Sequence, residues 1–425
     1  MAPVSAAVAA ETVAAMSDRT SANSLRRNHT FLRFWIASAG SGFGFQMLSV
    51  AVGWQIYSVT GRALDLGLIG LVQFIPSLLL ALPAGHVADQ FERRRIVLWG
   101  LGVEWIAIAA LAALTFSGHF SEFGTLGLLF IIGVAKAFES PALHAMLPAL
   151  VPAPLLPRAM AMNSSADQAA MIVGPALGGF LYLAGPGIVY GAAALLYLVS
   201  ALLMARLGYR QVRSPREPAT LQTVFAGVSF IRSRPDVLGV ISLDLFAVLL
   251  GGATALLPIF ASDILHTGAW GLGLLRAAPA AGALLMSLWL ARYALKRHVG
   301  MTMFAAVAGF GLATLVFALS TVLWLSLAAL AALGAFDMVS MVIRHSLVQL
   351  DTPDDMRGRV GAVNGIFINT SNQLGEFESG MLAAWIGAAP AVALGGIGTL
   401  LVVGLWMRLF PSLRRRQSLQ AGAEP

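Results

Sequence analysis

The sequence contains no cysteine, and charged residues make up only 11% of its 425 residues. The absence of cysteine excludes disulfide bonds and thiolate metal sites, and it leaves the redox compartment undetermined. A typical soluble domain has about 25% charged and about 45–50% apolar residues, whereas 58% of this chain is hydrophobic. So little charge over such a length indicates a polytopic membrane protein.

Acidic residues are scarcer than basic ones, with 20 Asp and Glu against 27 Lys and Arg, and the formal net charge is +7. In a soluble protein this excess would point to nucleic acid. In a membrane protein the basic excess of the cytoplasmic loops explains it, so no nucleic-acid partner is expected. Glu11 and Asp18 interrupt the first residues, which therefore contain no apolar signal-peptide core.

Apolar runs separated by charged residues or by Pro and Gly are long enough to cross a bilayer, which takes about 20 residues as a helix. Twelve such runs predict an all-α polytopic membrane protein with both chain ends on one side. The predicted spans are 33–58, 64–86, 96–117, 123–147, 159–183, 187–207, 237–262, 270–291, 300–319, 322–347, 359–386 and 390–409.

Basic residues fall almost entirely in every second loop, and Arg62 is the one arginine in the opposite loops. Cytoplasmic loops carry the excess of Lys and Arg, so both termini are predicted to be cytoplasmic. The predicted units are a disordered cytoplasmic tail at 1–30, a six-helix bundle at 31–207, a cytoplasmic linker at 208–235, a second six-helix bundle at 236–410 and a basic cytoplasmic tail at 411–425.

The two predicted bundles repeat each other in sequence. An offset of 201 residues pairs His144 with His345 and Asn163 with Asn364. Two parallel six-helix repeats, related by an axis along the membrane normal, explain an offset that spans six helices. Further pairs are Arg158 with Arg359, Gly174 with Gly375, Gly179 with Gly380 and, at an offset of 203, Arg93-Arg94 with Lys296-Arg297.

The hairpin between the second and third spans carries Gly85, Asp89, Arg93 and Arg94 in the pattern Gly-x-x-x-Asp-x-x-x-Arg-Arg. Anchoring at the cytoplasmic surface would explain the arginines. It does not explain Asp89, which lies four residues before Arg93 and can form an ion pair with it. The pattern resembles the signature loop of major facilitator superfamily transporters, although Gln90 replaces the usual Arg after the Asp.

Within this superfamily, the chain resembles the drug:proton antiporter branch that includes bacterial siderophore (enterobactin-type) exporters. The resemblance implies a multi-pass transporter of the bacterial inner membrane that alternates access between two six-helix halves. It spans about 31–410 and is carried by Gly53-Trp-Gln-Ile-Tyr-Ser-Val-Thr-Gly61, the hairpin at 88–94, Gly174-Pro-Ala-Leu-Gly-Gly179 and Thr352-Pro-Asp-Asp-Met-Arg-Gly-Arg359.

The resemblance also implies a cytoplasmic gate. In the family, the acid equivalent to Asp89 faces the start of helix 11, where the positive end of the helix dipole favours an anion. Such contacts exist only when the two halves meet on the inside. Gly85, Asp89, Arg93, Arg94 and Arg359 are therefore expected to stabilise the outward-open state.

A second motif lies in the fifth span and consists of Gly174, Pro175, Gly178 and Gly179. Small residues four apart let membrane helices approach closely, and proline bends a helix. Ordinary tight packing is one explanation. The other, implied by the resemblance, is a kinked and leak-proof helix that supports exchange instead of uniport.

Charged side chains inside the spans cost roughly 2.5–3.5 kcal/mol each on insertion scales and usually face a polar cavity or a partner. Asp337 has no basic residue three or four positions away, so it ranks first as carrier of a coupling proton. Glu139 has Lys136 one turn away, which should keep it ionised. Alternatively, Asp337 has only a structural role and forms hydrogen bonds with a neighbouring hydroxyl or backbone group. The full set of candidates is Asp337, Glu139, Lys136, Asp244, Glu378 and Glu376.

The predicted cavity lining is largely aromatic and apolar, and comprises Trp54, Gln55, Tyr57, Gln73, Phe246 and Met338. Such a lining favours proton-coupled export of a small amphipathic or hydrophobic compound, a drug or siderophore, by a monomer in the lipid bilayer without cofactor or metal. An importer of a nutrient or peptide is the alternative. A membrane-embedded enzyme is a remote one, because the acids at 351–355 have no second acidic cluster to bind metal with them.

Overall fold

The structure, a computed structural model, describes Leu25 and residues 28–209, 221–293 and 297–419. All regular elements in these residues are helices. Every predicted span corresponds to one helix or to a helix broken into shorter segments. The spans are α2 (His29–Thr60), α3 (Ala63–Leu79) with α4 (Ala81–Gln90), α5 (Arg93–Phe116), α6 (Glu122–Leu150), α7 (Leu156–Tyr182), α8 (Pro186–Ala205), α10 (Pro235–Leu250) with η2 (Ala253–Leu256), α11 (Leu257–Ile259) and η3 (Phe260–Ile264), α12 (Gly268–Arg292), α13 (Val299–Leu319), α14 (Leu323–Leu350), α15 (Asp354–Ile386) and α16 (Ala388–Leu409).

Nine segments in the described residues are long and apolar enough to cross a bilayer on their own. The three other predicted passes are α3 with α4, α7 and α15. The shortness of α3 and the polar and charged residues of α7 and α15 explain the difference, and α3, α7 and α15 each contact the opposite half of the molecule. Protein partners can accommodate polar groups that lipid cannot.

Two predicted spans are broken. The second pass ends as a regular helix at Leu79 and restarts at Ala81, because Pro83 has no N–H to donate to the Leu79 carbonyl and its ring clashes with that carbonyl. The seventh pass breaks at Gly251 and Gly252. A Cβ at Gly252 would lie 2.6 Å from the carbonyl carbon of Gly375, so this break lets α15 approach the backbone of the seventh pass.

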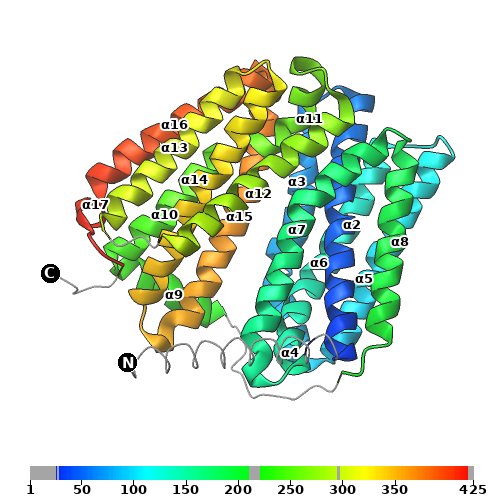
Figure 1. The fold of residues 1–425 in the computed structure, drawn as a ribbon, viewed down its shortest axis with the longest axis horizontal. Helices are drawn as coiled ribbons and strands as arrows, with labels where there is room; N and C mark the ends of the chain where they lie inside the picture. Colours follow the sequence, from blue (N-terminus) through cyan, green and yellow to red (C-terminus); the bar gives the residue numbers. More distant parts are fainter. Residues whose placement is uncertain (1–24, 26–27, 210–220, 294–296, 420–425) are drawn as a thin grey trace, which may run out of the picture.

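The chain forms two helical bundles that converge at one end and diverge at the other (Figure 1). One bundle contains α2 to α8, and the other contains α10 to α16 together with α9 (Leu221–Ser233) and α17 (Pro411–Arg415). A third apolar core joins them at the converging end. In this core, Val50 and Leu66 of the first bundle pack with Leu256 and Phe260 of the second.

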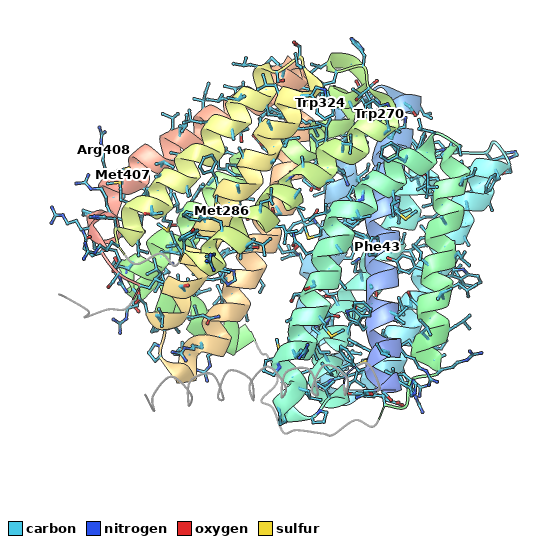
Figure 2. All side chains as sticks on the ribbon, in the orientation of Figure 1. Phe43, Trp270, Met286, Trp324, Met407 and Arg408 are labelled. Atoms are coloured by element: carbon cyan, nitrogen blue, oxygen red, sulfur yellow. The ribbon has the colours of Figure 1, made fainter. Side chains whose placement is uncertain are left out.

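The diverging end is the one predicted to face the cytoplasm, since it carries α4 and the start of α2 (Figure 1). Arg416, which follows α17, donates to Asp351 at the end of α14 at 2.8 Å, so the C-terminal segment also lies at helix ends that are predicted to be cytoplasmic. Trp270 and Trp324 lie at the converging end (Figure 2), as expected for aromatic residues at a membrane interface. Residues 1–24 and 210–220, where a disordered tail and part of the linker were predicted, lie outside the described residues.

Candidate functional site

A cavity of about 170 Å³ lies in the second bundle, between α10, α14 and α15. Arg344 projects into it and forms an ion pair with Asp244 of α10. The same guanidinium reaches Asp337 Oδ1 at 3.4 Å. Arg344 therefore interacts with two carboxylates, and the cluster has a net charge of −1 when both acids are ionised.

Asp337 was ranked first because the sequence shows no basic residue three or four positions away, and the nearby Arg344 contradicts that reason. Asp337 does have a cation beside it, but that cation lies seven residues away. Two turns along an α-helix bring side chains back to the same face, so the search at three and four residues missed it. The Arg344 side chain is only 11% exposed, so it points into the bundle and does not reach the cytoplasmic surface.

A second cavity of about 280 Å³ lies in the first bundle. Lys136, Glu139 and His144 of α6 line it together with Asn163 and Asp167 of α7. Within α7, the Asn163 amide donates to the Asp167 carboxylate at 3.0 Å. This cavity is therefore polar and contains groups of both charge signs.

Lys136 does not form the predicted ion pair with Glu139 among the interactions that the structure describes. Its ammonium group lies 3.3 Å from the centre of the Phe45 ring, a cation–π contact with α2. Glu139 is buried. Sequence spacing placed the two charges one turn apart, but the aromatic ring on the neighbouring helix determines where the lysine points.

The two cavities occupy equivalent places in the repeat. His144 and Asn163 line one cavity, and their counterparts His345 and Asn364 line the other. The recurrence of histidine and asparagine at one offset therefore marks these sites in the sequence. By itself, that recurrence indicates only an internal repeat. The same offset of 201 pairs Lys136 with Asp337, so a basic residue in the first cavity corresponds to an acidic residue in the second.

The residues predicted to line the cavity lie elsewhere in the first bundle. Gln55 is buried and accepts a hydrogen bond from the Tyr190 hydroxyl at 2.6 Å. Trp54 and Tyr57 pack on the core at the converging end. Gln73 donates to the carbonyl of its own helix at Ile69, at 3.4 Å.

The same holds in the second bundle. Phe246 is 40% exposed and stacks on Trp406 of α16, with ring centroids 5.3 Å apart. Neither Met338 nor the acids Glu376 and Glu378 are among the residues that line the two cavities. Apolar, polar and charged side chains together line these cavities, and the residues predicted from the sequence as aromatic lining are not among them.

The converging end is closed by contacts between the two bundles. The Tyr57 hydroxyl at the end of α2 donates to Asp263 of η3 at 2.5 Å. Deeper in the membrane, Arg276 of α12 donates to the hydroxyl of Ser49 in α2. These polar contacts join the two bundles at the converging end.

Glycines of the fifth-span motif take part in this closure. A Cβ at Gly178 would lie 2.9 Å from Cα of Met47, so α7 packs tightly on α2 within its own bundle. A Cβ at Gly179 would lie 3.0 Å from Cα of Gly273 in α12, across the interface. The motif also contains Gly174, which contacts Gln46, and Pro175, whose carbonyl oxygen would lie 2.6 Å from a Cβ at Gly273.

The predicted gate residues lie at the diverging end, where the two bundles are apart (Figure 1). Arg93 donates to the Ala145 carbonyl at 3.0 Å, and Arg94 donates to the Met204 carbonyl at 3.1 Å, so both bind helix ends of their own bundle. Arg359 contacts Met356 in α15. Gly85 lies in α4 with no atom within 4 Å of a Cβ there. The side chain of Asp89 lies outside the described part of the chain.

At the converging end, Arg62 binds Asp65 at 2.8 Å and Glu122 at 2.6 Å. The hydrogen bond to Asp65 raises the pKa of Arg62 above its ordinary value. This permanently charged group ties the start of α3 to the start of α6 in the outer loops.

Comparison with known proteins supports a transporter. A family model described as transmembrane secretion effector, within the major facilitator superfamily, matches residues 20–423. The chain is 28% identical over 398 residues to a protein named enterobactin exporter EntS from Citrobacter koseri, covering 92% of this chain and 94% of that protein. A protein of the same name from Shigella boydii is 26% identical over the same length.

Solved structures share the fold. A bacterial homologue of the lysosomal transporter Spinster, inward-facing and occupied, superposes with a TM-score of 0.72 at 13% identity, covering 92% of this chain and 97% of that one. A bacterial homologue of the iron transporter ferroportin, also inward-facing, gives a TM-score of 0.68 at 16% identity over 92% of this chain and all of that one. The chain thus belongs to the transmembrane secretion effector family of the major facilitator superfamily, as a multi-pass protein of the bacterial inner membrane.

Proposed function

We propose that this transporter exports a small amphipathic compound in exchange for protons by alternating access between its two bundles. One observation carries the proposal. Contacts between the bundles lie at the outer end, while a polar cavity with ionisable groups lies in the inner part of each bundle. This arrangement is the cytoplasm-facing state in which an exporter loads its substrate, and the relatives that are named exporters favour this direction over import.

Asp337 is the residue we propose to carry the coupling proton. It shares Arg344 with Asp244, but its contact is longer, at 3.4 Å, and its side chain is 45% exposed against 10% for Asp244. The weaker and more accessible partner of a shared arginine is the one that can exchange a proton without breaking the buried ion pair.

The substrate we propose is a siderophore-type compound with acidic or hydrogen-bonding groups. Relatives at 26–28% identity are named exporters of enterobactin. The cationic and hydrogen-bonding side chains Lys136, His144, Arg344 and His345 line the cavities, which suits such groups better than a purely hydrophobic drug.

The cytoplasmic gate remains part of the proposal. When the diverging ends close, Asp89 would meet the start of α15, where Arg359 lies, and this ion contact would stabilise the outward-open state. Arg93 and Arg94 already hold the ends of the neighbouring helices of their own bundle, so they would keep α4 in place during closure.

Import of a polar solute is the second candidate, because the polar lining is of the kind that an importer uses to recognise its substrate. Direction of transport distinguishes the two. Inside-out membrane vesicles with an acidic lumen should accumulate the exported compound, and a protonophore should abolish this accumulation.

The panel in this experiment contains catechol siderophores and hydrophobic drugs, with vesicles lacking the protein as control. Accumulation of a catechol siderophore supports the proposal, and accumulation of drugs alone supports export of a different substrate class. Uptake of a polar nutrient by right-side-out vesicles, without accumulation in inside-out ones, would overturn export.

A further inference from the structure

Glu104 in the middle of α5 is fully buried, and the mechanism proposed above does not use it. Neither of its carboxyl oxygens has a hydrogen-bond partner in the described part of the chain. Burying an ionised carboxylate without a partner would lower the folding stability by several kcal/mol. A buried acid without partners needs an explanation other than packing.

The neighbours of Glu104 are polar and come from two other helices. Glu139 of α6 and the hydroxyl of Tyr197 in α8 lie close enough to interact with its carboxyl group. The Tyr197 hydroxyl is itself buried without a partner. Three polar groups thus meet in one place, and small rotations would let them hydrogen-bond to one another.

Gly100 brings the two acids together. It lies one turn before Glu104 on the same face of α5, and a Cβ at this position would lie 2.9 Å from Cβ of Glu139. The missing side chain lets α5 and α6 approach until the two carboxyl groups become neighbours. The sequence therefore provides a specific small residue for this pairing.

The charges around the pair leave one carboxylate uncompensated. Lys136 is a cation that interacts with both acids, and its ammonium group lies over the Phe45 ring of α2. His144 and Asp167 line the same cavity as Glu139, and the titratable group that α8 presents to the pair is Tyr197. One lysine can balance one carboxylate, so two ionised acids here would leave a buried like-charge pair.

The pair also has a route to water. Glu139 and Tyr197 line the 280 Å³ cavity of the first bundle, whereas Glu104 lies behind them and is not among its lining residues. A proton from the cavity can therefore reach Glu139 directly and Glu104 through Glu139.

We propose that Glu104 and Glu139 form a second proton-binding site, in which the two carboxyl groups share one proton taken from the cavity of the first bundle. This inference deepens the proposed proton exchange and rests on it for its physiological role. It places one proton-carrying site in each bundle, the pair in the first and Asp337 in the second. A transport cycle that uses both sites moves more than one proton for each substrate.

Infrared difference spectroscopy of the purified protein, recorded without substrate, tests the site directly. The C=O stretch of a protonated, buried carboxyl group should be present in the unmodified protein at neutral pH. It should be lost or shifted in Glu104→Gln and in Glu139→Gln, and retained in Asp236→Asn, a control acid at the cytoplasmic start of α10. A band that is unchanged in both glutamine variants would overturn the proposal.

Transport supplies the second readout, with protons counted per molecule of a catechol siderophore in inside-out vesicles. Glu104→Gln should lower this ratio by one proton, whereas Glu104→Asp should restore it. An unchanged ratio in Glu104→Gln would overturn the proposed role. If the unmodified protein exchanges no compound for protons, the proposed function is wrong. The infrared result still decides whether the proton site exists.

Discussion

Gly179 of α7 and Gly273 of α12 lie backbone against backbone across the interface between the two bundles. A Cβ at Gly179 would be 3.0 Å from Cα of Gly273. The repeat places Gly380 of α15 in the same role against Gly67 of α3, where a Cβ at Gly380 would lie 2.7 Å from Cα of Gly67. Two pairs of glycines therefore bring the bundles together, and the internal repeat relates Gly179 of one pair to Gly380 of the other.

Replacing Gly179 by alanine should force α7 and α12 apart and shift the protein toward outward-open states. Overpacking costs about 1–3 kcal/mol, which corresponds to a population shift of roughly fivefold or more. Spin labels on cysteines that replace His119 and Val322, in outer loops of different bundles, should report a longer distance. Gly191→Ala in α8 is the control, because a Cβ there meets nothing within 4 Å. An equal distance change in both variants would exclude interface crowding as the cause.

Tyr57→Phe should also favour opening of the outer side. The change removes the 2.5 Å hydrogen bond from the Tyr57 hydroxyl to Asp263 and keeps the ring. A hydrogen bond to a charged group contributes about 1.5–3 kcal/mol when buried, and because Asp263 is exposed we expect about 1 kcal/mol. The same pair of spin labels measures the effect, and Tyr293→Phe at an exposed cytoplasmic position serves as control. A distance distribution identical to that of the unmodified protein would show that this bond does not hold the outer side closed.

Asp337→Asn should abolish efflux driven by a pH gradient while substrate binding persists. The asparagine keeps the shape of the side chain but can no longer gain and lose a proton. Efflux from inside-out vesicles and equilibrium binding of a catechol siderophore, measured in parallel, separate the two effects. Undiminished efflux with unchanged pH dependence would remove Asp337 from the coupling mechanism.

Asp244→Asn should destabilise the protein more than Asp337→Asn does. Asp244 forms the buried ion pair with Arg344, and removal of one partner of such a pair typically costs about 3–5 kcal/mol. The Asp337 contact is longer and more exposed, so its loss should cost less than about 1 kcal/mol. Thermal unfolding of the detergent-purified variants measures both. Equal melting temperatures would contradict the assignment of the main ion pair to Asp244.

Cysteine labelling of the cysteine-free chain tests its orientation. Cysteines that replace Glu92 and Gln417 should react only from the cytoplasm, and one that replaces His266 only from outside, because basic loops stay inside. Reaction of positions 92 and 266 from the same side would be incompatible with the twelve-span topology.

Much of the fold follows from the sequence because a bilayer imposes its own rule. Each span must be apolar over about 20 residues, and the basic residues must stay on one side. The predicted span 300–319, for example, is observed as α13, Val299–Leu319. The breaks near Leu80 and Gly251 were not predicted, because they depend on a proline kink and on the close approach of α15 to Gly252.

The chemistry of the candidate site depended on contacts between helices. Sequence spacing identified Asp337, Glu139 and Lys136 as charges inside the membrane, but it could not show that Lys136 turns to Phe45 or that Asp337 shares Arg344 with Asp244. Apolar residues partition into lipid and charged residues into water, so composition and hydropathy determine the spans and the orientation. The partner of a buried charge is set by how the helices pack, and only the tertiary structure decided it.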